Sequence, residues 1–171
     1  MRLIAEEQKM GTLELLMTSP VRESEMVLGK FLGSLSILLA MLVLTLFYPF
    51  LLGAFAQPDM GPILSGYVGL ALFGAAFLAV GLLASSVTSN QILSAVLGLG
   101  LLLLLWLFSA ASGYAANIPW AKAIVDYVAL TTIYVDFLRG VIDTRAVIYL
   151  VSLTVTVLFI TTRAVEARRW R

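Results

Sequence analysis

Long uncharged apolar runs, separated by short polar stretches, are the dominant pattern of this chain. No charged residue lies between Lys30 and Asp59, and none lies between Asp59 and Lys122. A charge near the centre of a bilayer costs at least ~2.5 kcal/mol on insertion scales, and about 20 apolar residues are needed to cross. The pattern therefore predicts four membrane-spanning helices. We place them at about 31–56, 63–84, 92–112 and 146–162.

Polar and helix-breaking residues mark the connections between these spans. The sequence Gln57-Pro58-Asp59-Met60-Gly61-Pro62 predicts a turn, because two prolines, a glycine and an aspartate do not continue a helix. Pro49 predicts a kink in the first span or the start of its exit from the bilayer. The polar cluster 85–91 divides the long uncharged interval into the second and third spans. The fourth span is short, and Arg163 would extend it by snorkelling.

The segment that precedes the first span has the pattern of a cytosolic amphipathic helix. Within residues 3–17, apolar side chains recur on one helical stripe while Glu7 and Glu14 project elsewhere, so the segment can lie on a membrane surface. Pro20 then suits the first position of a new helix. We expect that helix to run continuously through Lys30 into the bilayer.

Residues 113–145 are too polar for a full span and too apolar for a solvated loop. Aromatic and aliphatic side chains alternate there with charged ones, which predicts one or two short helices that re-enter the outer leaflet against protein. The charged residues would form local ion pairs that tether this re-entrant element, or would contribute to an extracellular gate. They are Asp126, Asp136, Arg139, Asp143 and Arg145.

The distribution of basic residues predicts the orientation. Of the 11 Lys and Arg residues, eight flank the side of the two termini and three lie on the opposite side. Cytoplasmic segments carry the excess of Lys and Arg. We therefore expect a multi-pass protein of the inner cell membrane with both termini in the cytoplasm.

Composition narrows the chemistry of the chain. The 171 residues are 61% hydrophobic and 12% charged, with a mean hydropathy of +1.01, which excludes an ordinary soluble domain. Cysteine and histidine are absent, which excludes thiol nucleophiles, imidazole bases and most transition-metal sites. Gly29-Lys30 is followed by Phe31 and does not form a phosphate-binding loop. We predict no enzymatic activity, no cofactor and no nucleic-acid partner.

Two stretches carry a family resemblance. The first reads Glu6-Glu7-x-Lys9-x-Gly11-Thr12-Leu13-Glu14-Leu15-Leu16-x-x-Ser19-Pro20, followed by Gly29-Lys30-Phe31. The second reads Asp136-Phe137-x-Arg139-Gly140-Val141-Ile142-Asp143 and is joined by the terminal Glu166-x-Arg168-Arg169-Trp170. With these motifs the chain resembles ABC-2-type transporter permeases, close to the subgroup of gliding-motility-associated permeases.

The resemblance implies roles for the first 30 residues. In such permeases the glutamate-rich element is the cytosolic coupling helix between the second and third of six spans, and it docks on the ATP-binding subunit, which binds the ATP. Gln8 departs from the usual Lys or Arg, although Lys9 can serve instead. The residues carried over as ATPase contacts are Glu6, Glu7, Lys9, Gly11, Thr12 and Glu14.

The resemblance covers the whole chain but only the last two-thirds of the family, since the first two spans are missing. Either the chain is a fragment, which we favour, or it is a reduced protein that uses the helices of another subunit. The fold it implies is an all-α integral membrane domain over residues 1–171. A second permease copy or a homologue would complete the transporter.

Two functions from different classes remain open at this point. The first is the permease subunit of an ATP-driven ABC exporter. The second is a non-transporting membrane scaffold or assembly factor that recruits a cytosolic protein through residues 3–25. For Glu6, Glu7 and Glu14, the plain alternative to an ATPase contact is the solvated face of an interfacial helix.

Overall fold

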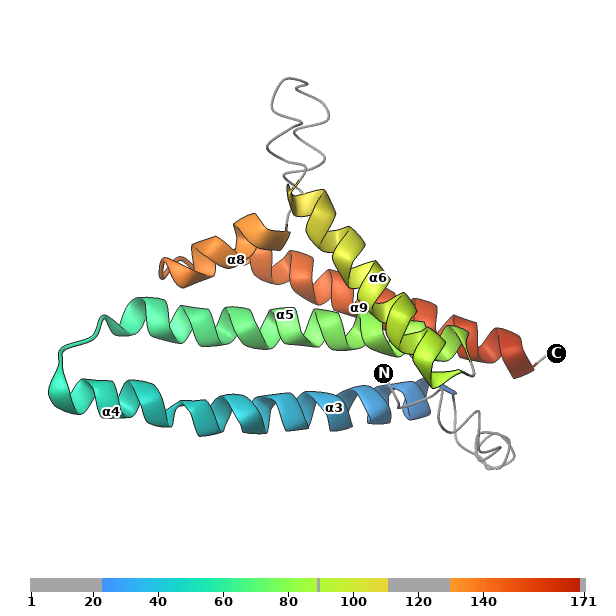
Figure 1. Cartoon of the computed structure of the whole chain (residues 1–171), viewed down its shortest axis with the longest axis horizontal. Helices are drawn as coiled ribbons and strands as arrows, with labels where there is room; N and C mark the ends of the chain where they lie inside the picture. Colours follow the sequence, from blue (N-terminus) through green and yellow to red (C-terminus); the bar gives the residue numbers. More distant parts are fainter. Residues whose placement is uncertain (1–22, 89, 111–129, 170–171) are drawn as a thin grey trace, which may run out of the picture.

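The computed structural model describes residues 23–88, 90–110 and 130–169, and each structural statement below concerns these residues. Every described element is an α-helix, which confirms the predicted all-α fold class. The helices are α3 (Glu23–Thr45), α4 (Phe47–Phe55), α5 (Met60–Val87), α6 (Gln91–Ala110), α8 (Leu130–Leu138) and α9 (Thr144–Arg169) (Figure 1).

Several of these helices can cross a membrane by length and composition. The ranges Glu23–Phe55, Met60–Val87 and Thr144–Ala167 are long and apolar enough, and Gln91–Leu107 is a shorter apolar helix. Together with the family match reported below, they make the chain a multi-pass membrane protein. α8 is a short helix inside the region 113–145, where the sequence predicts one or two short helices.

α5 is the central helix, and it packs against α3, α6, α8 and α9. α3 and α4 run antiparallel to α5 (Figure 1). α9 packs along α5 and also contacts α3. The described start of α3, the α5–α6 connection and the C-terminal part of α9 thus gather at one end, which we term the terminal end. The α4–α5 and α8–α9 connections lie at the other end, the turn end (Figure 1).

The first apolar run is divided into α3 and α4 by a break at Leu46. Pro49 explains the break, because proline has no amide hydrogen and its ring clashes with the carbonyl four residues earlier, here that of Thr45. The backbone turns more tightly at this point, and the Leu46 N–H donates to the Val43 carbonyl at 3.1 Å. The kink predicted from Pro49 therefore lies nearly one helical turn before the proline itself.

The connection between α4 and α5 is shorter than predicted. The Asp59 carboxylate caps α5 by accepting a hydrogen bond from the Gly61 N–H at 3.0 Å. Met60, Gly61 and Pro62 consequently belong to the helix rather than to the predicted turn. The physical reason is that the first N–H groups of a helix have no partner within it, so a proline in that turn removes no hydrogen bond.

The polar cluster 85–91 is also only partly a connection, since α5 continues to Val87 and α6 begins at Gln91. Ser85 and Ser86 are fully buried within α5. Ser86 Oγ donates to the Leu83 carbonyl at 2.7 Å. A serine hydroxyl can bond to a carbonyl one turn earlier in its own helix, so these polar residues do not need solvent.

Two clusters form the core. The cluster at the terminal end joins α3, α5 and α9, and the cluster at the turn end joins α5, α8 and α9. Outside these clusters many large apolar side chains are exposed, among them Phe50 at 79% and Phe55 at 85%. Such a surface is unusual in water and suits contact with lipid chains.

Candidate functional site

The predicted ATPase contacts, Glu6, Glu7, Lys9, Gly11, Thr12 and Glu14, lie outside the described residues. The structure does describe the helix that this segment leads into. α3 begins at Glu23 and runs through Lys30 to Thr45 without interruption.

The start of α3 is anchored in the core. Val27 is fully buried and Phe31 is only 7% exposed, and both belong to the terminal-end cluster. Their partners in that cluster come from α5 and α9. The partners are Ala79, Val80, Leu82, Val157, Leu158 and Val165. We call this arrangement the α3 anchor.

The rest of α3 and the whole of α4 are held more lightly. Leu38 packs against Gly74 of α5, where an added methyl group would collide with the leucine side chain. Farther along, Tyr67 OH donates to Thr45 Oγ1 at 3.0 Å. α4 contains no buried residue. The α3 anchor is thus the place where the first apolar run is most firmly joined to α5 and α9.

Buried hydroxyl groups are concentrated in and near the α3 anchor. Ser94 of α6 and Thr161 of α9 are fully buried, as are the two α5 serines described above. Thr161 Oγ1 donates to the Val157 carbonyl at 2.8 Å. Among the described residues, no buried side-chain nitrogen or oxygen lacks a hydrogen-bond partner. Small, satisfied side chains let the helices approach closely here.

At the turn end, α8 packs against α5 through two aromatic side chains, Phe137 and Tyr134. Phe137 is fully buried, and it lies against Gly69, where an added Cβ would stand 2.8 Å from the phenylalanine Cβ and Cγ. Ser65 Oγ donates to the Phe137 carbonyl at 2.6 Å. The rings of Tyr134 and Phe73 meet edge to face at 5.2 Å. Only glycine at position 69 leaves room for Phe137 to pack this closely on α5.

The motif from Asp136 to Asp143 ends α8 and starts α9. Gly140 has a φ of +89°, its N–H donates to the Phe137 carbonyl, and the Val141 N–H donates to the Asp136 carbonyl. This is the Schellman motif that commonly ends helices at glycine. Asp143 Oδ1 then accepts from the Arg145 N–H at 2.9 Å and caps α9. The residues of this motif that resemble the permease subgroup thus include several whose role is to end α8 and to cap α9.

The predicted ion pairs of this region are not found among its described members. Asp126 lies outside the described residues. Asp136, Arg139, Asp143 and Arg145 are described, and no ion pair joins these four side chains. An ion pair in the described part of α9, that of Arg163 with Glu166 at 2.7 Å, lies at the terminal end. Asp136, Asp143 and Arg145 instead line a hollow of about 680 Å³ between α8 and α9.

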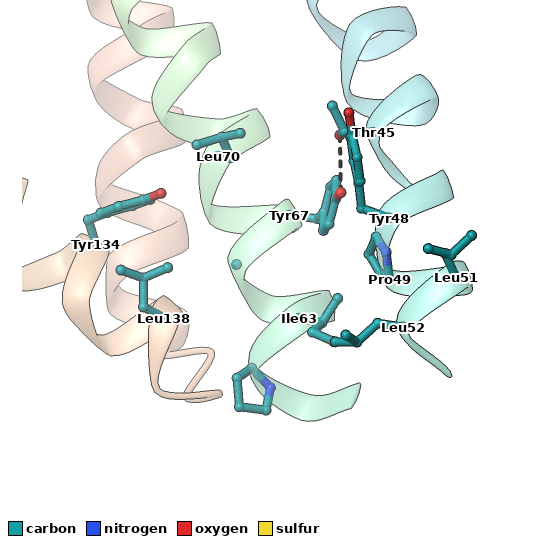
Figure 2. Close-up of a pocket in the computed structure, with 12 residues that line it drawn as sticks. Thr45, Tyr48, Pro49, Leu51, Leu52, Ile63, Tyr67, Leu70, Tyr134 and Leu138 are labelled. Carbon is teal, nitrogen blue, oxygen red and sulfur yellow. Dashed lines mark hydrogen bonds between the residues drawn. The ribbon is translucent and has the colours of Figure 1, made fainter. Parts of the chain in front are cut away.

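A second hollow at the turn end was also not predicted from the sequence. It is a groove of about 590 Å³ with α5 as its floor and α4 and α8 as its walls, and we call it the lateral groove (Figure 2). Its lining comes from three stretches of the chain, 45–52, 62–70 and 134–138, so no single local pattern could reveal it. The lining residues are Thr45, Tyr48, Pro49, Leu51, Leu52, Pro62, Ile63, Gly66, Tyr67, Leu70, Tyr134 and Leu138.

Comparison with known proteins gives a match at the level of a family. A family model described as ABC-2 family transporter protein matches residues 1–161. Neither a curated protein nor a solved structure matches the chain.

Proposed function

The chain belongs to the ABC-2 transporter family, and from this membership we propose that it is the transmembrane permease subunit of an ATP-driven exporter. The family match over residues 1–161 is the observation that carries the proposal. In the proposed mechanism, a separate ATP-binding subunit hydrolyses ATP, and its closure displaces the N-terminal segment. The displacement rocks the spans between inward-open and outward-open states. The chain itself forms no covalent intermediate.

The position of the α3 anchor supports this mechanism. Protein cores are closely packed and transmit displacement instead of absorbing it. Because Val27 and Phe31 are buried against α5 and α9, movement of the start of α3 would be passed directly to those two helices. The lightly held α4 would follow.

The polar face of residues 6–14 is the proposed docking surface for the ATPase subunit. Its acidic residues would pair with basic groups in a groove of the partner, and such charge complementarity fixes register and specificity more than raw affinity. Glu6, Glu7 and Glu14 would supply the charge, and Gly11 and Thr12 would allow close approach. The ATP-binding site belongs to the partner.

We further propose an orientation in the inner membrane with the terminal end in the cytoplasm. The excess of basic residues on that side supports it. α8 would then be the re-entrant helix of the outer leaflet, since it ends at the turn end and is packed on α5. A second permease copy or a homologue would cover part of the exposed apolar surface. Within the family, the two motifs support a place near the gliding-motility-associated subgroup.

Uncoupling the α3 anchor tests the mechanism. The full chain is reconstituted in vesicles together with its ATPase subunit. Phe31→Leu should leave the ATPase subunit bound but reduce the stimulation of ATP hydrolysis by the chain. Phe31→Ala should do so more strongly, because emptying a buried phenylalanine site costs about 3–5 kcal/mol. Phe50→Ala is the matched control, since Phe50 is 79% exposed on α4.

The outcome also separates transport from scaffolding. A scaffold needs only the docked segment, so both Phe31 variants would keep wild-type hydrolysis as long as the ATPase subunit stays bound. Wild-type hydrolysis by a folded Phe31→Ala complex would therefore contradict transmission through the α3 anchor. A loss of the same size in Phe50→Ala would also contradict it.

A further inference from the structure

We infer that the lateral groove is a binding site for one acyl chain of a membrane phospholipid. The inference concerns a ligand of the membrane domain and does not depend on the ATPase subunit. It rests on the size of the groove, the chemistry of its lining, the difference between its two walls and its opening onto the lipid-facing surface.

The groove has the dimensions of a chain within one leaflet. Along its floor the lining residues of α5 extend from Pro62 to Leu70, which at about 1.5 Å per residue is roughly 12 Å. The hydrocarbon core of a bilayer is about 30 Å thick, so one leaflet contributes roughly 15 Å. The groove starts at the first turn of α5, next to the turn end. It therefore spans most of one leaflet from its polar edge inward.

The lining is apolar and uncharged. Among the residues that the structure describes, no Asp, Glu, Lys or Arg lines the groove. Two of the hydroxyl groups that line it are hydrogen-bonded to each other, because Tyr67 OH donates to Thr45 Oγ1 (Figure 2). A charged ligand would lose its hydration here and would meet no opposite charge among the described lining residues, which is costly. An aliphatic chain has no hydrogen bonds to lose.

Three tyrosines line the inner part of the groove. Tyr48, Tyr67 and Tyr134 come from α4, α5 and α8, and Tyr67 and Tyr134 lie farther from the turn end than Ile63 and Leu138 (Figure 2). The Tyr67 hydroxyl points further inward, to Thr45. The tyrosine rings therefore offer broad apolar faces against which an aliphatic chain can pack.

The two walls differ in how firmly they are held. α8 is fixed to α5 by Phe137 on Gly69 and by the hydrogen bond from Ser65. α4 has no buried residue and follows the break at Leu46. A chain can thus enter by a small outward movement of α4 without opening the core.

The groove is continuous with surface that faces lipid. Leu51 and Leu52 line it and are themselves 46% and 52% exposed, and the neighbouring Phe50 is more exposed still. In a multi-pass membrane protein this surface meets acyl chains directly. A lipid therefore reaches the groove by lateral diffusion and needs no aqueous path.

Photolabelling with a lipid probe tests the inference. The full chain is purified in dodecyl maltoside micelles, to which phosphatidylcholine with a diazirine on one acyl chain is added in increasing amounts. After illumination, labelled peptides are mapped. We expect saturable labelling of residues such as Leu52, Ile63 and Tyr134 that unlabelled phosphatidylcholine displaces. Exposed positions on α6, such as Val96 and Leu99, should show weaker labelling that rises linearly with probe.

A matched pair of glycine substitutions sharpens the test. Gly66 lines the groove, and a Cβ there would make only an ordinary contact of 3.8 Å with Leu138, so Gly66→Leu should fill the groove without displacing α8. A Cβ added at Gly33 on α3 would meet nothing within 4 Å, so Gly33→Leu adds the same side chain elsewhere. We expect Gly66→Leu to lose most of the saturable labelling and Gly33→Leu to keep it.

Two results would overturn the inference. One is labelling of the wild-type groove that is no stronger and no more saturable than labelling of α6. The other is saturable labelling that survives in Gly66→Leu and also in a second filling variant, Ile63→Trp. If Gly66→Leu does not insert, Ile63→Trp and the wild-type map decide the matter. Either result leaves ATPase docking untouched, so this inference and the proposed function can fail separately.

Discussion

Single residues at the turn end decide how closely two helices approach. Gly69 has no side chain, and Phe137 occupies the space that one would fill. Gly140 adopts a left-handed conformation that other residues avoid. The sequence showed both glycines and the phenylalanine, but nothing in their local pattern indicated that positions 69 and 137 meet. Such pairings depend on tertiary packing, which a single sequence does not encode locally.

Substitution of Gly69 by alanine should therefore destabilise the packing of α8 on α5. The new Cβ would stand 2.8 Å from Phe137, and overpacking of this kind typically costs about 1–3 kcal/mol. Thermal unfolding in detergent micelles measures the effect. Gly33→Ala is the control, because that position is open and alanine improves helix propensity by up to ~1 kcal/mol. Equal stability of Gly69→Ala and Gly33→Ala would contradict the close packing of Phe137 on Gly69.

At the scale of elements, the uncharged runs predicted the helices well and their ends less well. A bilayer tolerates few charges, so long uncharged runs mark spans whatever their neighbours are. Helix ends depend on local hydrogen bonds that several sequences satisfy. Asp59 caps α5 earlier than the prolines suggested. α9 continues as a helix to Arg169, beyond the residue at which the membrane span was expected to end. Arg163 and Glu166 form an exposed ion pair in this part of α9.

The break between α3 and α4 gives a prediction at this scale. Pro49→Ala restores an amide hydrogen and removes the clash with the Thr45 carbonyl, so the helix should continue through Leu46. Hydrogen exchange of the amides from 46 to 50 should slow in micelles. Pro62→Ala is the control and should change nothing in that region, because Pro62 stands in the first turn of α5, where no N–H partner is needed. Unchanged exchange in Pro49→Ala would refute the attribution of the break to the proline.

At the scale of the whole molecule, the terminal end and the turn end carry different functions in our account. The terminal end joins the start of α3 to α5 and α9 through Val27 and Phe31, and it receives the ATPase subunit. The turn end holds α8, the hollow near Asp136 and the lateral groove. The sequence predicted the polar N-terminal segment and the family. The groove and the anchor needed the fold, since each combines at least three helices.

The measurement that tests the central claim most directly is co-purification of the full chain with its ATP-binding subunit. The double reversal Glu7→Lys and Glu14→Lys should abolish co-purification while membrane insertion is retained, because truncating one side of a buried charged contact costs about 2–5 kcal/mol. Reversal of Asp126 is the control and should leave co-purification unchanged. Wild-type co-purification by the double reversal would contradict docking through this segment, and with it the account of the chain as an ATP-driven permease.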